Sequence, residues 1–140
     1  MSQANCIFCD ISSGKSETTL ELDTDEFVIF KDIKPASKYH YLIVTKHHYE
    51  SLKVLDKSHE KLVTRMEDTL KDFFKSKGIS TTDALFGFHM PPFISVKHLH
   101  LHGIAPRSEM GFFARLVFKP SAPWFKCAKE AQAYLNAKSV

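Results

Sequence analysis

The stretch His98-Leu99-His100-Leu101-His102 decides the fold, because three imidazoles alternate with two leucines over five residues. Successive side chains of a β-strand point to opposite faces, so the pattern predicts a strand with histidines on one face and leucines on the other. Leu99 and Leu101 would pack on a core while the histidines line a cleft. Histidine acts as a nucleophile, a base or a metal ligand near neutral pH. Two other interpretations stay open: three ligands of one metal ion, or three satisfied polar side chains.

Length and composition predict one globular domain over residues 1–140. Of the 140 residues, 44% are hydrophobic, which is enough for a core without disulfide staples. No apolar run approaches the length of a membrane span, and the N-terminus lacks the pattern of a secretory signal. The formal net charge of +3 is too small to indicate a nucleic-acid-binding surface. We therefore expect neither a membrane nor a nucleic acid as a partner.

Cysteine usage favours a reducing compartment. Cys6, Cys9 and Cys127 make an odd number, and the first two form a close C-x-x-C pair. This pattern does not fit a disulfide framework. We expect a cytoplasmic protein, with the nucleus as a second location. Cys127 stands alone on an amphipathic segment and is expected to be a packing residue.

Hydrophobic periodicity predicts an α+β fold with a mainly antiparallel sheet of about five strands. Apolar residues at helical spacing predict a long helix over residues 58–77, ended by Gly78, and a C-terminal helix over residues 124–137. A short helix or turn is expected over residues 4–13, and residues 112–119 fit either a strand or a helix. The predicted strands cover residues 18–22, 26–31, 40–45, 84–88 and 98–105.

The histidine pattern resembles the signature of the histidine triad (HIT) nucleotide-binding superfamily, and the resemblance covers residues 5 to 106 in order. It also rests on Ser95, three residues before the first histidine of the pattern. The other matching segments are Phe30-Lys31-Asp32-Ile33-Lys34-Pro35, His40-Tyr41-Leu42-Ile43-Val44 followed by Lys46 and His48, Gly87-Phe88-His89-Met90-Pro91-Pro92-Phe93, and Trp124-Phe125. Together they look most like the third Hint-type branch. The resemblance implies a HIT-like fold and a homodimeric hydrolase of purine nucleoside 5′-phosphoramidates and acyl-adenylates such as aminoacyl-AMP, releasing AMP.

The resemblance also implies covalent catalysis at phosphorus by histidine. His100 is expected to attack the α-phosphate, giving a nucleotidyl-histidine intermediate that water then hydrolyses. His102 would donate to a phosphate oxygen, while His98 and His40 would orient the cluster and fix the tautomers of their neighbours. Ser95 would give a proton to the leaving amine or donate to the phosphate, and its alternative interpretation is a turn serine. This chemistry requires no cofactor.

Three further residues are expected to bind the nucleotide. The two carboxylate oxygens of Asp32 can accept hydrogen bonds from both ribose hydroxyls, although a turn aspartate before a proline has the same appearance. Ile33 and the region of Phe8 would form an apolar slot for the base. His89 lies where Hint-type proteins usually carry an asparagine.

Cys6 and Cys9 have the spacing of half a zinc site. The resemblance implies that His48 and His98 complete a closed Cys₂His₂ structural site, which would leave His100 free for catalysis. His47 could take the place of His48. The alternative interpretation is two small buried residues in a turn.

The chain departs from the Hint-type pattern just before Ser95. Pro91-Pro92-Phe93-Ile94 replaces a glycine-rich segment and a glutamine, and the prolines lack backbone N–H donors for a phosphate. The missing glutamine argues against a dinucleoside polyphosphate hydrolase. Two other functions stay open: aprataxin-like removal of AMP from nucleic-acid ends, and a nucleotide-sensing or scaffold role. The first would need a strong basic patch and an added zinc finger, and the intact histidine pattern argues against the second.

Overall fold

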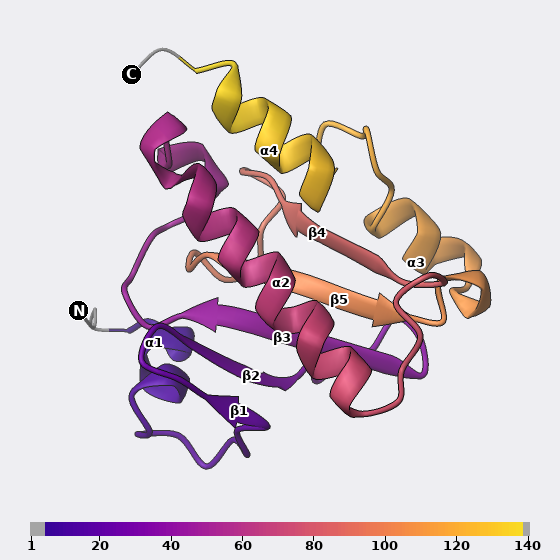
Figure 1. Cartoon of the computed structure of the whole chain (residues 1–140), viewed down its shortest axis with the longest axis horizontal. Helices are drawn as coiled ribbons and strands as arrows, with labels where there is room; N and C mark the ends of the chain where they lie inside the picture. The colour runs from indigo at the N-terminus through magenta and orange to yellow at the C-terminus, as the bar shows by residue number, and fades with distance from the viewer. Residues whose placement is uncertain (1–4, 139–140) are drawn as a thin grey trace.

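The computed structural model describes residues 5–138 and contains a six-stranded antiparallel sheet (Figure 1). The strand order is β1-β2-β3-β5-β4-β6. The strands are β1 Leu22–Asp23, β2 Phe27–Lys31, β3 Tyr39–Thr45, β4 Leu85–His89, β5 His100–Ala105 and β6 Phe125–Cys127. The helices are α1 Ile7–Ser12, α2 Glu60–Ser76, α3 Phe112–Val117 and α4 Ala128–Asn136, and short 3₁₀ helices lie at Leu52–Val54, Lys57–His59 and Arg107–Glu109. This arrangement confirms the predicted α+β fold.

Helix α2 crosses one face of the sheet, with α4 beside it (Figure 1). Its apolar stripe is buried in the main core together with Leu99 and Leu101. Gly78, with a φ of 73°, ends the helix, and Ile79 N–H donates to Phe74 O at 2.9 Å, as the sequence predicted. The leucines of the alternating stretch therefore face α2, and the neighbouring histidines face away from it.

Gly103 continues the leucine side of β5. A Cβ on Gly103 would lie 2.8 Å from Leu70 Cδ2 and 2.9 Å from Phe74 Cζ, so a larger residue would force these side chains of α2 to move. On the opposite face of the sheet, α1 packs on β2 and β3 through Phe8 and its neighbours. The histidine side of β5 thus lies between α1 and the C-terminal part of the chain.

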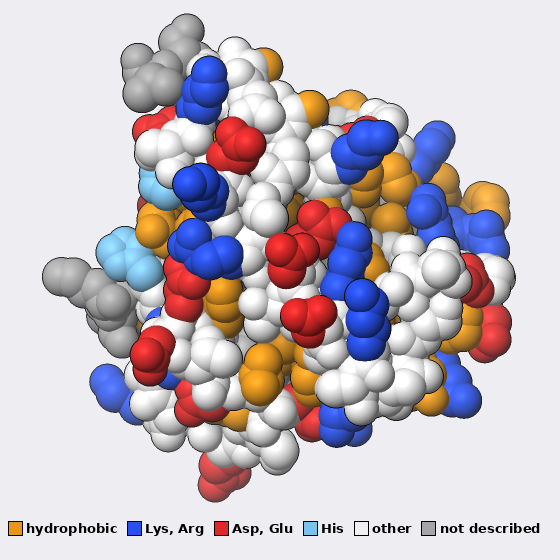
Figure 2. Space-filling model, viewed as in Figure 1, with side chains coloured by type: hydrophobic (Ala, Val, Ile, Leu, Met, Phe, Trp, Pro, Cys, Tyr) orange, Lys and Arg blue, Asp and Glu red, His pale blue; other side chains and the backbone are white. Residues whose placement is uncertain are grey.

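The face of the molecule seen in Figure 2 carries acidic and basic side chains that are intermixed with apolar and uncharged ones. The apolar side chains of the α2 stripe are buried in the core, so this stripe is not available for contact with a second molecule. Among the described residues, no helix is both long and apolar enough to cross a membrane.

Three element predictions were wrong at their ends. The C-terminal helix begins at Ala128, because Phe125–Cys127 pairs with β4 as the strand β6, where Phe125 is fully buried. The strand predicted over residues 18–22 is reduced to β1, which begins at Leu22. The histidine strand begins at His100 rather than at His98. The segment 112–119, for which the sequence left strand and helix open, forms the helix α3. Hydrophobic periodicity could not detect β6. The strand has only three residues, and they run directly into the apolar pattern of α4, so they look like the first turn of that helix.

Candidate active site

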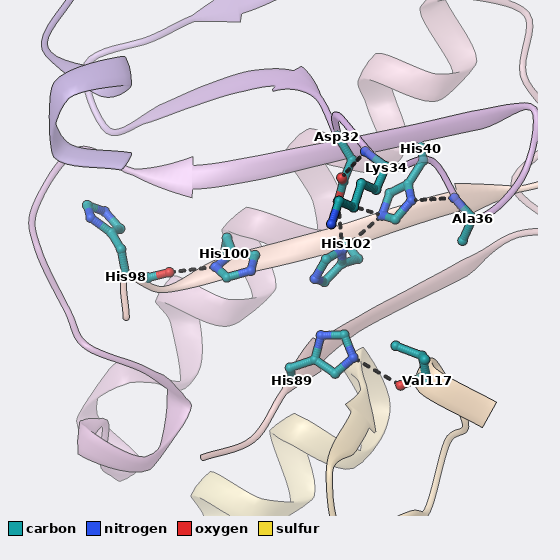
Figure 3. Close-up of polar contacts among 9 residues, drawn as sticks. All are labelled: Asp32, Lys34, Ala36, His40, His89, His98, His100, His102 and Val117. Atoms are coloured by element: carbon teal, nitrogen blue, oxygen red, sulfur yellow. Dashed lines mark hydrogen bonds and ion pairs between the residues drawn. The ribbon is translucent and has the colours of Figure 1, made fainter. Parts of the chain in front are cut away.

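Strand β5 holds His100 and His102 on the face turned away from α2, and His98 lies two residues before the strand (Figure 3). All three side chains are buried. The rings of His100 and His102 have their centroids 5.0 Å apart, and the edge of Phe8 lies against His100 at 4.9 Å. The alternation of the sequence has therefore placed a row of imidazoles in a largely apolar setting.

His100 has a defined tautomer. Its Nδ1 lies 2.6 Å from the carbonyl oxygen of His98, and because a carbonyl can only accept, Nδ1 carries the proton. Burial lowers the pKa of His100 to about 4 despite the opposing effect of this hydrogen bond. His100 is therefore neutral near pH 7, with a lone pair on Nε2. A neutral imidazole of this kind is a competent nucleophile.

His40 on β3 sets the tautomer of His102. Ala36 N–H donates to His40 Nδ1 at 2.9 Å, so the proton of His40 is on Nε2. That Nε2 lies 2.9 Å from His102 Nδ1, which must accept, and the proton of His102 is therefore on its Nε2. Burial lowers the pKa of His40 to about 4, against the charge of Asp32, and burial together with the neighbouring imidazoles holds the pKa of His102 well below 6.5.

His102 Nε2 is a buried hydrogen-bond donor that has no acceptor among the described residues. In the described part of the chain it is the one buried side-chain nitrogen or oxygen without a hydrogen-bond partner. Leaving such a group unpaired costs on the order of 1–3 kcal/mol. An anionic oxygen bound beside His102 would accept this hydrogen bond. The lone pair of His100 Nε2 and the proton of His102 Nε2 would then act on the same bound group.

A cavity of about 360 Å³ opens beside these two histidines. Asp32, which follows β2, lies on its wall, with Oδ1 accepting from Lys34 N–H at 2.8 Å and Oδ2 3.3 Å from His40 Nε2. Ser95 and Phe8 also line this cavity, and Ile33 stands at its rim with 92% of its surface exposed. The structure thus brings five of the six predicted nucleotide-binding residues to one cavity, Asp32, Ile33, Ser95, His100 and His102, although Ile33 is open to solvent rather than enclosed.

His89 lies on the other side of the histidine row from Asp32 (Figure 3). Its Nε2 donates to Val117 O at 3.0 Å, and its ring centroid is 5.1 Å from that of His102. Burial lowers the pKa of His89, so it too is neutral near pH 7. The sequence placed His89 among the nucleotide-binding residues, but it does not line the cavity that holds Asp32.

Phe118 is a site residue that the sequence did not reveal. Its ring centroid lies 5.4 Å from His40, 5.0 Å from His102 and 4.9 Å from His89. It closes the end of the histidine row with an apolar wall and so contributes to the burial that lowers the pKa of these imidazoles. Phe118 directly follows α3, far from the motifs in sequence, and no local pattern pointed to it.

The four predicted metal ligands meet at one point. The ligand atoms of Cys6, Cys9, His48 and His98 all lie within 4.8 Å of one another. His98 Nδ1 is 3.3 Å from Cys6 Sγ and 3.2 Å from His48 Nδ1, and Cys9 Sγ is 3.3 Å from His48 Nδ1. A tetrahedral Zn²⁺ with its usual bond lengths of about 2.0–2.1 Å to nitrogen and about 2.3 Å to sulfur separates such ligand atoms by about 3.3–3.8 Å. The donor set therefore fits a closed Cys₂His₂ site.

His98 is oriented for a role as ligand. Its Nε2 donates to Thr45 O at 2.6 Å, which leaves the lone pair on Nδ1, the atom that faces the cysteines. Burial lowers the pKa of His98 to about 4. His47, the alternative ligand, is exposed and its ring lies tilted against Tyr49, with ring centroids 4.5 Å apart, so the structure favours His48.

This chain is similar to known proteins over most of its length. The model of the family described as "Scavenger mRNA decapping enzyme C-term binding" matches residues 5–117. The chain is 42% identical to the adenosine 5′-monophosphoramidase HINT3 of Mus musculus over 87% of this chain and 76% of that protein. It is 40% identical to the protein of the same name from Xenopus tropicalis over 95% of this chain and 88% of that one. Among solved structures, a histidine triad protein from Clostridium difficile matches with a TM-score of 0.70 and 30% identity, over 74% of this chain and 92% of that chain.

Proposed function

Since this chain belongs to the histidine triad (HIT) family, we propose that it is a nucleoside 5′-phosphoramidate hydrolase, an adenosine 5′-monophosphoramidase that releases AMP. One observation carries the proposal: His100 Nε2 has a lone pair and His102 Nε2 has an unpaired proton beside one cavity. The names of the relatives agree with this chemistry. Acyl-adenylates, in which a carboxylate bonded through oxygen replaces the amine on the same phosphate, are included in the proposed substrate class.

The first step transfers the nucleotide to the enzyme. His100 Nε2 attacks the α-phosphorus, a nitrogen–phosphorus bond forms, and the bond to the leaving amine breaks with its electron pair on the amine nitrogen. The Ser95 hydroxyl gives that nitrogen its proton. His102 Nε2–H donates to a phosphate oxygen as negative charge develops, and the His98 carbonyl stabilises the positive charge that His100 acquires.

The second step restores the enzyme. Water attacks the same phosphorus, its hydroxyl stays on the nucleotide, and its other proton returns to Ser95. The bond to His100 breaks, which regenerates the neutral imidazole and AMP. Asp32 holds the ribose hydroxyls through both steps, and the slot beside Phe8 receives the purine.

The test is the release of AMP from adenosine 5′-phosphoramidate. We expect turnover by the wild-type protein and its loss in His100→Ala, with AMP binding retained. Undiminished turnover in that variant would contradict the mechanism. Absence of turnover in both proteins, with nucleotide still bound, would favour the nucleotide-sensing role instead.

We also propose that Cys6, Cys9, His48 and His98 hold a structural zinc ion. Support comes from the ligand geometry and from the hydrogen bond that fixes His98. The bound ion would tie α1 to β3 and to the start of β5, and its four protein ligands leave no open position for a substrate. Since such ligands must be reduced thiolates, this proposal accords with the cytoplasm and nucleus as locations.

Metal content distinguishes the two adjacent histidines. We expect about one zinc per chain in the wild-type protein and in His47→Phe, and loss of zinc in His48→Phe and Cys6→Ser. Equal metal contents in all four proteins would overturn the assignment of ligands.

A homodimer is the proposed assembly. Phe112 and Phe113 on α3 are 72% and 79% exposed and place two neighbouring aromatic side chains on the surface. We expect a dimer in sedimentation experiments and a monomer after Phe113→Asp. A wild-type monomer at all concentrations would rule the dimer out.

A further inference from the structure

The cavity beside Asp32 has a particular balance of charges. Of the described residues that line it, only Lys31, Asp32 and Lys34 have side chains that are charged at neutral pH, the histidines set aside. A nucleotide would bring its phosphate, a second negative charge, into the space that already holds the Asp32 carboxylate. A cation on the wall of this cavity would offset the repulsion between the two anions.

The histidine row does not supply that cation. His40 Nδ1 accepts from Ala36 N–H, and His102 Nδ1 accepts from His40 Nε2–H, so each of these two rings has a single proton and is neutral. His100 must keep a lone pair on Nε2 to attack phosphorus, so it too is neutral before the reaction. The positive charge must therefore come from one of the two lysines.

Lys31 has its side chain on the other face of the sheet. It ends β2 and lies opposite Tyr41 in the register with β3. Residues that lie opposite each other in an antiparallel pair point to the same face. The ring of Tyr41 packs against Phe73 and Phe74 of α2, with centroids 5.0 and 5.8 Å apart. The side chain of Lys31 is therefore on the α2 side, away from the histidine row.

Lys34 lies on the side of the histidine row. Its backbone N–H donates to Asp32 Oδ1 at 2.8 Å, which fixes the turn after β2. From this turn the side chain of Lys34 extends toward His102, at the wall of the same cavity (Figure 3). In the described part of the chain its ammonium group forms no ion pair. The side chain is exposed and has a flexible stem, so its charge can reach an anion bound beside it.

We propose that Lys34 binds the substrate phosphate, with its ammonium group donating to a non-bridging oxygen of the phosphate that lies beside His100 and His102. The lysine keeps its proton throughout. Its charge offsets the negative charge that grows on the phosphate oxygens as His100 attacks. This inference rests on the proposed hydrolase function and adds to the same site a phosphate-binding residue from outside the histidine row.

Binding of AMP and of adenosine measures this contact. The two ligands share the base and the ribose, and only AMP carries the phosphate. We expect Lys34→Met to weaken AMP binding by about tenfold in calorimetry at low ionic strength, as the loss of a charge-assisted hydrogen bond implies. The affinity for adenosine should stay unchanged, because the backbone N–H that holds Asp32 remains in this variant.

Two further variants serve as controls. Lys34→Arg keeps the positive charge at the same position and should retain most of the affinity for AMP. Lys31→Met removes an equal charge three residues away, on the other face of the sheet, and should bind AMP as the wild type does.

Kinetics place the same contact in the reaction. With adenosine 5′-phosphoramidate we expect Lys34→Met to lower kcat/KM by about tenfold or more, since the phosphate gains charge in the transition state. Added salt screens an exposed ion pair. It should therefore lower kcat/KM of the wild type and of Lys31→Met more than that of Lys34→Met.

The outcomes separate the two proposals. If the wild-type protein releases AMP and Lys34→Met equals it in AMP binding and in kcat/KM, the role of Lys34 is wrong and the hydrolase function stands. Equal losses in Lys31→Met and Lys34→Met would show a general effect of net charge. A parallel loss of adenosine binding in Lys34→Met would show that Lys34 acts through Asp32. Either result overturns the phosphate contact. If the wild-type protein cleaves nothing, the proposed function fails, and AMP binding still decides on Lys34.

Discussion

At the scale of single residues, the site depends on which nitrogen of each imidazole carries its proton. Two backbone groups make that choice: the carbonyl of His98 for His100, and the N–H of Ala36 for His40. The tautomer of His40 in turn fixes that of His102, because His40 Nε2–H donates to His102 Nδ1. Two histidines with the same side chain thus receive opposite roles, a lone pair on one Nε2 and a proton on the other.

The role of His40 can be measured by replacing it. In His40→Phe, His102 Nδ1 loses its donor, and the proton is free to occupy either nitrogen. We expect kcat for adenosine 5′-phosphoramidate to fall by about 10²-fold, the lower end of the usual effect of a positioned proton donor, with a much smaller change in KM. His47→Phe is the matched control, because His47 is exposed and its ring lies tilted against Tyr49 outside the cavity. Equal kcat values for the two variants would remove His40 from the mechanism.

The acid limb of the pH–rate profile reports on His100. Burial lowers the pKa of His100 from 6.5 to about 4, so Nε2 keeps its lone pair until the pH approaches that value. We expect kcat/KM to be nearly constant from pH 7 to pH 5 and to fall near pH 4. The measurement requires a parallel check that the protein is folded at each pH. If kcat/KM of the folded protein instead fell with a midpoint near pH 6.5, burial would not be lowering the pKa of His100.

At the scale of elements, the most consequential feature is β6, which the periodicity did not predict. It pairs with β4, where Gly87 lies opposite Cys127, and its first residue follows Trp124, which lines a second cavity together with His89. Helix α3, whose type the sequence left open, supplies Leu116 and Val117 on the opposite wall. The part of the chain that was hardest to predict therefore builds the second cavity.

Gly87 permits the pairing of β4 with β6. A Cβ on Gly87 would collide with the ring of Phe125 and lie 2.7 Å from the backbone oxygen of Lys126, so β6 would have to move. We expect Gly87→Ala to lower the free energy of unfolding by about 2 kcal/mol, as overpacked cores usually do. Urea denaturation followed by circular dichroism measures the change.

Gly111→Ala is the control for this substitution. Gly111 has an ordinary φ of −74°, and a Cβ there would meet nothing within 4 Å. Its free energy of unfolding should stay within about 0.5 kcal/mol of the wild-type value, as for most surface substitutions. A loss as large as that of Gly87→Ala would mean that the clash with β6 is not the cause.

At the scale of the whole molecule, the buried imidazoles make stability depend on pH. The pKa of His40 is lowered to about 4 by burial, whereas an unfolded histidine titrates near 6.5. Between these values the unfolded chain binds more protons than the folded protein, so protonation favours unfolding. Stability is unaffected by this group above pH 6.5 and decreases as the pH falls toward 4.

Acid titration of stability checks this dependence. One group with such a shift changes the free energy of unfolding by at most about 3 kcal/mol. We expect urea midpoints to decline from pH 6.5 to pH 4.5 in the wild-type protein and to decline less steeply in His40→Phe. Parallel declines in the two proteins would assign the pH dependence to other groups.

The sequence by itself determined the histidine row, the strand that carries it, the long helix behind it and the cysteine pair of the candidate metal site. These features follow from local rules: the alternation of side chains along a strand, the helical spacing of apolar residues and the spacing of cysteines. The resemblance extended them to a family and a reaction. The positions of Asp32 and Ser95 on one cavity agree with that reading, and their roles are left to the experiments above.

Only the tertiary structure decided which proton each histidine holds, that Phe118 closes the row, and that a second cavity lies across it from Asp32. The tautomer of His102 and the contact of His89 with Val117 depend on groups distant in sequence: His40 and His102 are 62 residues apart, and His89 and Val117 are 28 apart. Such contacts arise when the sheet and α3 pack together. Because hydrogen-bond direction and burial are properties of that packed arrangement, no local pattern in the chain encodes them.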